Sequence, residues 1–241
     1  MGSGIRQYEE LAKYYDLLYS WKDYEREAKI LRQLIARYKR SRGNALLDVG
    51  CGTGKHIQQL KRSFVCVGID ANEGMLEQAR RRVEGVEFVR GDMASFALGR
   101  EFDVILCLFS SIGYLRTPAS LARTLRNFAR HLLPGGVVII EPWFTRSTFI
   151  DGHTHVLSQG TEDLKIVRVD YGKVEGNHSI LDERIVVAEK GRGITSYRDR
   201  MVMSLFEREE FLESMRQAGL ESRYLKKSLA PGRGLYVGVK A

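Results

Sequence analysis

The chain contains little cysteine or proline and no long apolar run. Of its 241 residues, three are cysteines and four are prolines. No Cys-x-x-Cys pair or Cys/His spacing suggests zinc, so we expect the cysteines to be buried free thiols. No stretch reaches the roughly 18 to 20 apolar residues of a membrane helix, and residues 1–16 lack the apolar run of a secretory signal. We therefore expect a cytoplasmic protein.

Positive charge is in excess but is not concentrated in one region. The formal net charge is +8, which would suit an anionic partner, either nucleic acid or a phosphorylated small molecule. Short basic clusters at 39–42 and 80–82 fall on or just after helix-like segments, where a solvated helix face is the ordinary explanation. The charge alone therefore does not identify a nucleic-acid site, and nucleic acid is not the expected partner.

Short apolar runs alternate with amphipathic stretches between residues 45 and 141. This alternation is typical of βαβ units and predicts a doubly wound, mostly parallel Rossmann-like α/β sheet with helices on both faces. The expected strands are Ala45–Val49, Phe64–Ile69, Val86–Arg90, Asp103–Leu108 and Val137–Glu141, and the expected helices are Lys55–Lys61, Glu73–Val83 and Pro118–Leu133, the last closed by Pro134, Gly135 and Gly136.

The flanking segments have a different pattern. Residues 5–40 place Tyr8, Leu11 and Tyr15 on one face of an expected helix, and residues 1–44 are interpreted as a helical cap. Residues 145–205 alternate apolar and polar side chains between glycine-rich turns, which predicts an inserted antiparallel sheet over the acceptor site. Residues 45–144 and 206–241 would form the main domain, and its expected final elements are a helix at Glu207–Ala218 and strands near Glu221–Lys227 and Gly234–Lys240.

The strongest signal is the sequence LLDVGCGTG at residues 46–54, in which a strand runs directly into a glycine loop and then a helix. Glycines allow a sharp turn and close approach of a ligand to the backbone. A dinucleotide fingerprint would place its last glycine at Lys55. A phosphate-binding P-loop would need glycine at Val49 and serine or threonine at His56. Both phosphate-binding interpretations fail.

Three carboxylates follow strands at the edge of the sheet where such folds bind ligands. Asp48 precedes the loop, Asp70 ends the second strand and Asp92 follows the third. Pyrophosphate would be repelled there, whereas an adenosyl ligand with a cationic sulfonium and a ribose diol would be attracted. The spacing between Gly54 and Asp70 suits an acid that accepts both ribose hydroxyls, and Asp92 with Met93 is placed to meet the adenine edge.

The segments DVGCGTG, GID, GDM and LLPGG, in this order and spacing, resemble the class I S-adenosylmethionine-dependent methyltransferases. The resemblance implies S-adenosylmethionine as cofactor. It also implies a set of cofactor-binding residues that come from the N-terminal segment, the glycine loop and the ends of the strands: Tyr15, Tyr19, Asp48, Gly50, Cys51, Gly52, Gly54, Asp70, Ala71, Met75, Asp92, Met93, Leu108 and Phe109.

A narrower resemblance covers nearly the whole chain. The stretches 14–28, 108–117, 141–144 and 231–241 are similar to N,N-dimethyltransferases that act on nucleotide-linked amino sugars, of the desosamine-pathway type. This implies a small amine acceptor that is N-methylated. Tyr114, a poor general base because an unperturbed tyrosine has a pKa of about 10, is expected to orient the amine. Trp143, Arg146 and Arg233 are candidates for contact with the rest of the acceptor.

Two alternative functions stay open from the sequence. One is a methyltransferase for RNA or protein, and the other is a non-catalytic S-adenosylmethionine-binding protein. His153 and His155 would face one side of a strand, but no third ligand is near, so no metal is expected. His56, His131 and His178 have no evident partners. The sequence does not fix the acceptor, the number of methyl groups or the oligomeric state, for which a homodimer is one option.

Overall fold

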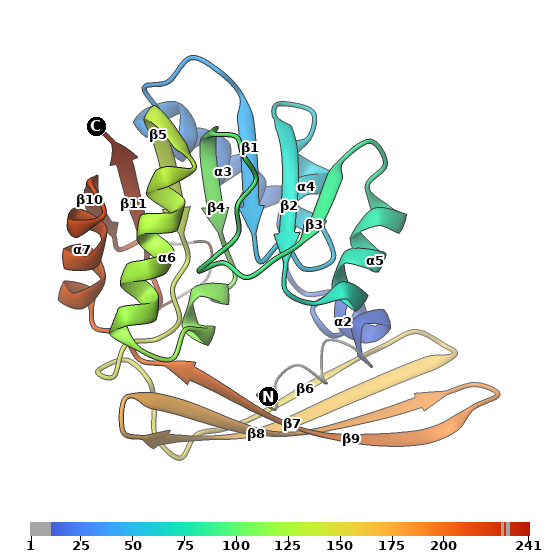
Figure 1. The fold of residues 1–241 in the computed structure, drawn as a ribbon. Helices are drawn as coiled ribbons and strands as arrows, with labels where there is room; N and C mark the ends of the chain where they lie inside the picture. The colour runs from blue at the N-terminus through green and yellow to red at the C-terminus, as the bar shows by residue number, and fades with distance from the viewer. Residues whose placement is uncertain (1–10, 228, 230–231) are drawn as a thin grey trace.

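The computed structural model of the chain describes residues 11–227, 229 and 232–241. Within these residues, seven strands form the central sheet. The strand order is β10-β11-β5-β4-β1-β2-β3, in which β5, β4, β1, β2 and β3 run parallel and β10 and β11 are antiparallel to their neighbours (Figure 1). The bounds are β1 Ala45–Val49, β2 Val65–Asp70, β3 Glu87–Arg90, β4 Phe102–Cys107, β5 Leu132–Ile140, β10 Leu220–Leu225 and β11 Leu235–Lys240.

Helices cover both faces of this sheet because successive strand residues point to opposite sides. On one face, Leu47 and its equivalents in the neighbouring strands pack against α6 and α7. On the other face, Leu46 and its equivalents pack against α3, α4 and α5. The helix bounds are α3 Tyr24–Tyr38, α4 Lys55–Leu60, α5 Glu73–Arg82, α6 Pro118–Arg130 and α7 Arg208–Gln217. The predicted doubly wound α/β class is confirmed.

A second, antiparallel sheet lies across the carboxyl ends of the parallel strands (Figure 1). Its strands follow chain order: β6 Thr154–Gly160, β7 Leu164–Glu175, β8 His178–Glu189 and β9 Gly193–Ser204. Helix α2, Ala12–Leu18, packs against this sheet through Tyr14 and Leu18, which share an apolar cluster with Ile166 and Ile185. The two sheets and α2 therefore enclose the space beyond the strand ends.

Most element boundaries lie within one or two residues of the sequence expectations, and the largest differences fall at two places. The long N-terminal helix is interrupted after Leu18, and Asp23 caps a new helix by accepting a hydrogen bond from the Arg26 amide at 2.9 Å. Residues 5–10 of the expected span, with Tyr8, lie outside the described residues. The expected helix Pro118–Leu133 ends at Arg130, because residues 133–136 form a bulge within β5 instead of closing the helix.

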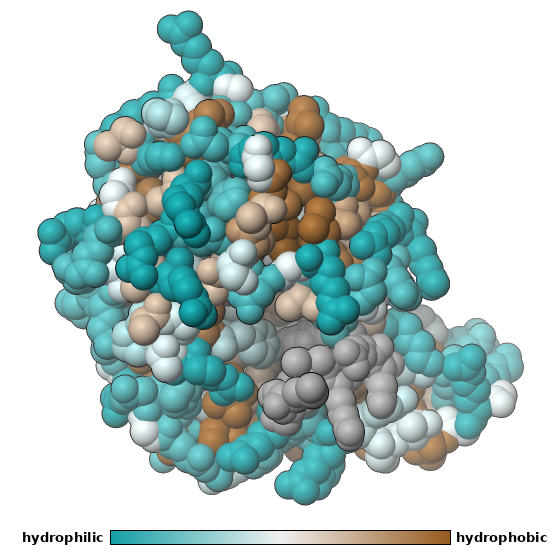
Figure 2. Space-filling view, in the orientation of Figure 1, coloured by the Kyte–Doolittle hydropathy of each residue, from teal (hydrophilic) through white to brown (hydrophobic). Residues whose placement is uncertain are grey.

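The molecular surface has mixed character. On the face shown in Figure 2, hydrophilic residues predominate and hydrophobic residues gather over β2 and β3, between α5 and α6. All three cysteines are buried and free, as expected. Within the described residues, no helix is long and apolar enough to cross a membrane.

Candidate active site

The glycine loop joins β1 to α4 in a backbone conformation that favours glycine. Gly50, Gly52 and Gly54 have φ angles of +73°, +54° and +76°. The amides of Gly50 and Cys51 donate to the Ile69 carbonyl at 2.8 and 2.9 Å, which ties the loop to β2. A Cβ atom at Gly52 would have no neighbouring atom within 4 Å. The loop therefore presents open space where a ligand can approach the backbone.

A cavity of about 670 Å³ extends from this loop to the second sheet. Eleven of the fourteen residues expected to bind a cofactor line it, whereas Asp48, Gly54 and Asp92 do not. The fold brings these distant segments of the chain to one wall, because they come from α2 and the turn after it, the glycine loop, the start of α5 and the ends of the strands. The eleven are Tyr15, Tyr19, Gly50, Cys51, Gly52, Asp70, Ala71, Met75, Met93, Leu108 and Phe109.

Gly54 faces away from the cavity. It is the N-cap of α4, and a Cβ at this position would lie 3.2 Å from Ala79 Cβ on α5 and 3.4 Å from the Phe88 ring on β3. Glycine is therefore needed here for close packing of the loop against the fold, and not for contact with a ligand.

Asp70 lies on the cavity wall at the carboxyl end of β2. Its Oδ2 atom accepts a hydrogen bond from the Gly52 amide at 2.8 Å, and its Oδ1 atom accepts one from the Asn72 amide at 2.9 Å. Burial raises the pKa of Asp70, and the backbone hydrogen bonds oppose this by favouring the ionised form. The carboxylate is therefore held in a fixed position beside the glycine loop.

The other two carboxylates of the expected set do not reach the cavity wall. Asp92 is exposed and accepts a hydrogen bond from the Ala94 amide at 2.7 Å, so it caps the turn after β3 while its neighbours Gly91 and Met93 line the cavity. Asp48 is buried behind the loop because it lies within β1. All three lie at one edge of the sheet, as expected, but side-chain direction separates them.

Burial of Asp48 gives a testable pH dependence. Burial raises the pKa of Asp48 to about 6; His56 opposes the effect and nearby Asp70 adds to it. In the unfolded chain, Asp48 has its ordinary pKa of 3.8. Between pH 3.8 and about pH 6, the folded chain therefore holds a proton that the unfolded chain has released. As a result, the contribution of Asp48 to the free energy of unfolding falls as the pH rises through this window.

We expect Asp48→Asn to remove this loss. The stability difference, variant minus wild type, should increase by up to about 3 kcal/mol between acid and neutral pH. Urea unfolding of both proteins on either side of the window measures it. A difference that is the same at both pH values would contradict the shifted pKa.

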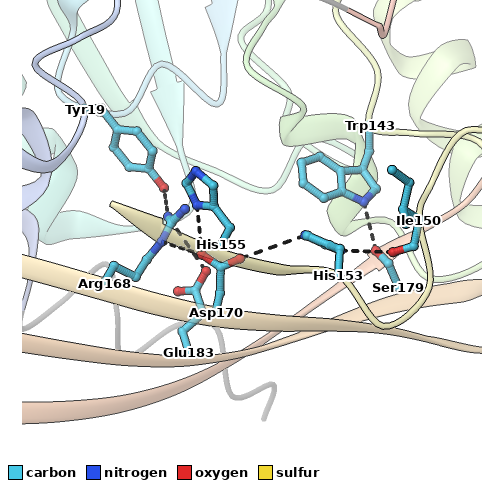
Figure 3. A network of polar contacts seen from close by, with 9 residues as sticks. All are labelled: Tyr19, Trp143, Ile150, His153, His155, Arg168, Asp170, Ser179 and Glu183. Atoms are coloured by element: carbon cyan, nitrogen blue, oxygen red, sulfur yellow. Dashed lines mark hydrogen bonds and ion pairs between the residues drawn. The ribbon is translucent and has the colours of Figure 1, made fainter. Parts of the chain in front are cut away.

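Tyr19 connects the cofactor side of the cavity to the second sheet. Its ring centroid lies 4.6 Å from that of Tyr15 and 5.2 Å from that of Phe109. Its hydroxyl oxygen accepts a hydrogen bond from Arg168 Nη1 at 2.8 Å (Figure 3). Burial raises the pKa of Tyr19, so the phenol stays protonated at neutral pH. The sheet and the turn after α2 are thereby joined over the cavity.

Tyr114 and Trp143 line the part of the cavity beyond the end of β4. Tyr114 ends a short 3₁₀ helix, Ser111–Tyr114, and its hydroxyl lies 3.0 Å from Met201 Sδ on β9. Trp143 Nε1 donates to Ser179 Oγ on β8 at 2.8 Å (Figure 3). Both side chains therefore span the distance between the central sheet and the second sheet.

The two arginines expected near the acceptor have different surroundings. Arg233 lines the cavity, donates from Nη1 to Ser110 Oγ at 2.6 Å and lies 5.6 Å from the Trp143 ring centroid. Arg146 is exposed and outside the lining, and its backbone amide donates to Glu207 Oε1 at 3.2 Å. Of the two, the structure brings Arg233 to the cavity.

Sequence reasoning missed a polar row on the inner face of the second sheet. The strand register aligns His155, Asp170, Glu183 and Asp199 across β6 to β9. Arg168 lies two residues before Asp170 on the same face, and Figure 3 shows it beside His155, Asp170 and Glu183. His155 and Arg168 line the cavity. The charged residues of β7 were visible in the sequence, but the face of the sheet that becomes buried was not.

A second buried network lies behind the glycine loop. His56, which had no evident partner in the sequence, has its Nε2 atom 2.7 Å from Glu27 Oε2, and Lys22 pairs with the other oxygen of Glu27. Burial acts to raise the pKa of Glu27, but the hydrogen bonds and charges of His56 and Lys22 outweigh it, so the pKa is lowered. His56 lines the cavity, but its Nε2 atom is engaged by Glu27 in this network.

The other two histidines without evident partners contact backbone carbonyls. His131 Nδ1 lies 2.9 Å from the Asn127 oxygen, and His178 Nε2 lies 3.0 Å from the Arg116 oxygen. Among the described residues, no group of three or more side chains is placed to hold a metal ion.

These features define a class of protein. A parallel sheet whose first strand enters an open glycine loop, with an acid at the tip of the second strand and no phosphate-binding pattern, fits an adenosyl ligand. Residues 46–136 match the family model described as a methyltransferase domain. The chain is a class I S-adenosylmethionine-dependent methyltransferase.

Comparison with individual proteins places it more narrowly. The chain is 37% identical over 95% of its length to the dTDP-3-amino-3,4,6-trideoxy-alpha-D-glucopyranose N,N-dimethyltransferase of Streptomyces venezuelae, of which it covers 98%. Its fold is similar to that of DesVI from the same organism, whose crystal structure is known, with a TM-score of 0.90 and 37% sequence identity. The match covers 95% of this chain and 98% of DesVI.

A further solved structure contains the cofactor. The chain is similar, at a TM-score of 0.82 and 33% identity, to the S-adenosylmethionine-bound amino pentose methyltransferase CalS10 of Micromonospora echinaspora, with coverage of 91% of this chain and 92% of that chain. The chain therefore belongs to the family of the dTDP-amino-sugar N,N-dimethyltransferases.

Proposed function

We propose that this enzyme transfers methyl groups from S-adenosylmethionine to the amine of a nucleotide-linked amino sugar. The observation that carries the proposal is the continuity of the cavity, which runs from the glycine loop and Asp70 to Trp143 and Arg233. A volume of about 670 Å³ is large enough for the cofactor with an acceptor beside it. Three relatives at 37% or 38% identity carry dTDP-amino-sugar substrates in their names.

In this proposal the cofactor occupies the wall formed by the glycine loop. Asp70 would accept hydrogen bonds from the ribose diol, and Met93 would lie against the adenine. Tyr15 and Tyr19 would cover the cofactor from the N-terminal side. The sulfonium is already activated, so methyl transfer needs no acid or base group beside the sulfur. The protein's main contribution is to align the acceptor nitrogen with the methyl group and to exclude water.

The acceptor would then lie between Tyr114, Trp143 and the second sheet. Trp143 offers an indole face, and Arg233 offers a guanidinium, the group best suited to grip a phosphate. The Arg233 Nε atom is buried and has no hydrogen-bond partner among the described residues, which supports a polar ligand in that position. Residues 145–205 would thus act as an inserted unit that closes the acceptor site, and residues 1–44 would supply its N-terminal cover.

Methyl uptake from labelled S-adenosylmethionine tests the proposed acceptor. We expect nucleotide-linked sugars with an amine at carbon 3 or carbon 4 to gain one or two methyl groups by mass spectrometry. The matched control is the corresponding hydroxyl sugar, which should gain none. Methylation of RNA or protein with no activity on any amino sugar would overturn the proposal and favour a macromolecular substrate.

Tyr114→Phe tests the orienting role. We expect kcat to fall about two- to tenfold while the cofactor Kd stays nearly unchanged, because the variant loses the proposed contact to the reacting amine and keeps the aromatic ring. The hydroxyl is bonded to a weak thioether acceptor, so little stability should be lost. Tyr38→Phe, at the end of α3 and outside the cavity lining, is the control and should leave kcat unchanged. A kcat loss of more than about 100-fold would instead assign Tyr114 a proton-transfer role.

Two broader features also stay proposals. S-adenosylmethionine and nucleotide-linked sugars are intracellular metabolites, so we place the reaction in the cytoplasm. We also propose a homodimer in which two copies pair through the outer face of the second sheet, where Val156, Val169 and Tyr171 are 63%, 50% and 47% exposed. Sedimentation velocity of the wild type and Val169→Glu measures this, and a monomeric wild type would contradict it.

A further inference from the structure

Methylation of an amine releases a proton that must leave the cavity. An aliphatic amine is protonated at neutral pH, and an ammonium nitrogen has no lone pair with which to attack a methyl group. Each methyl transfer therefore requires loss of one N–H proton before or during attack. The following inference rests on the proposed amine acceptor and concerns where that proton goes.

Most titratable side chains on the cavity wall are already engaged. His56 Nε2 is bonded to Glu27, and Asp70 accepts two backbone hydrogen bonds beside the glycine loop. Burial raises the pKa of Tyr19, so its phenol is a poor proton acceptor. Among the described lining residues, His155 is the remaining histidine, and histidine is the side chain that exchanges protons most readily near neutral pH.

The position of His155 suits proton transfer between the cavity and solvent. It lies on β6, the edge strand of the second sheet, and its side chain is 53% exposed although it lines the cavity. In Figure 3 the imidazole projects from the strand on the same side as the Tyr19 ring and the Arg168 guanidinium. A proton taken from the cavity can therefore pass to water without crossing the core.

Asp170 is placed to orient this histidine. Its Oδ2 atom lies 3.5 Å from His155 Nδ1, and Asp170 is itself 4% exposed and accepts a hydrogen bond from Arg168 Nε at 3.1 Å. A carboxylate on Nδ1 fixes the tautomer that leaves Nε2 free to accept a proton. The present separation is long for a hydrogen bond, as is common for catalytic pairs before the substrate binds.

Side chains of the second sheet and of the turn after α2 set the charge around His155. The groups that face this region from the packed elements are His153 on β6, Arg168 and Asp170 on β7, Glu183 on β8, Asp199 on β9 and Tyr19 after α2. Asp170 and Glu183 place two carboxylates beside the single guanidinium of Arg168.

We infer that His155, held by Asp170, accepts the proton released when the acceptor amine is methylated. The N–H bond of the ammonium breaks and its proton passes to His155 Nε2, directly or through one water. The electron pair left on nitrogen forms the new bond to the methyl carbon, while the bond between that carbon and sulfur breaks and its electrons stay on sulfur. His155 then releases the proton to solvent, and the same cycle serves a second methyl transfer.

Kinetics of His155→Gln test this inference, with His153→Gln as the matched control. His153 lies two residues away and also faces Asp170, at 4.0 Å, but it does not line the cavity. At neutral pH we expect kcat to fall about 100-fold in His155→Gln and to stay near wild type in His153→Gln. The loss should diminish at alkaline pH, where free amine is abundant. Added imidazole should partly restore kcat in His155→Ala.

A second measurement does not depend on turnover. In the complex with S-adenosylhomocysteine, addition of the amine acceptor should move the His155 imidazole NMR signals toward the imidazolium form, with little change at His153. Asp170→Asn should weaken this response and shift the pH profile of kcat. Wild-type kcat in His155→Gln at neutral pH, or His155 signals that do not respond, would overturn the inference. An inactive wild type would instead contradict the proposed function.

Discussion

Gly52→Val is expected to abolish S-adenosylmethionine binding while the protein stays folded. A Cβ at this position would contact no protein atom, so the branched side chain would extend into the cavity and occupy the space that the cofactor needs. The φ angle of +54° adds backbone strain of about 1 to 2 kcal/mol, which a domain of this size can tolerate. Isothermal titration calorimetry measures the loss of binding, and circular dichroism measures the fold.

Gly99→Val separates the cavity effect from the strain. Gly99 also has a positive φ, +65°, and a Cβ there would likewise meet open space, but this residue does not line the cavity. The variant should lose similar stability and keep its affinity for the cofactor. If Gly52→Val binds S-adenosylmethionine as strongly as Gly99→Val does, the cofactor does not approach the glycine loop as proposed.

Asp70→Ala is expected to weaken cofactor binding by about 1.5 to 3 kcal/mol, or about 10- to 150-fold in Kd. The carboxylate would lose hydrogen bonds to the ribose diol, and the Gly52 amide would lose the acceptor that holds the loop. Asp70→Asn keeps one oxygen for that amide but loses the charge, so its Kd should lie between those of the wild type and the alanine variant. Calorimetry at fixed ionic strength measures all three.

Asp163→Ala controls for the general loss of negative charge. Asp163 is exposed in the turn between β6 and β7, pairs with Lys190 at 2.8 Å and is not part of the cavity lining. The same change in net charge there should leave the cofactor Kd nearly unchanged. An Asp70→Ala variant with unchanged affinity would remove the ribose assignment, and equal losses in both variants would show a nonspecific electrostatic effect.

The parallel core could be predicted from the sequence because its signals are local. The alternation of apolar runs and amphipathic segments follows from side-chain periodicity, and β1 was predicted to the residue. The positions of the glycine loop and Asp70 were likewise predicted, because a turn with positive φ and an acid at a strand tip leave a direct mark on residue type. The errors, at Leu18 and in residues 131–136, fell where a helix ends and a bulge begins, which local periodicity constrains weakly.

The sequence by itself determined the fold class, the cofactor and the edge of the sheet at which the site lies, because each depends on residue type and spacing along one segment. Only the tertiary structure decided that Asp48 and Asp92 turn away from the cavity, that Arg233 and not Arg146 reaches it, and that His155, Arg168 and Asp170 form one polar row. These arrangements depend on which face of each strand is buried and on register between strands distant in sequence, and neither is fixed until the chain packs.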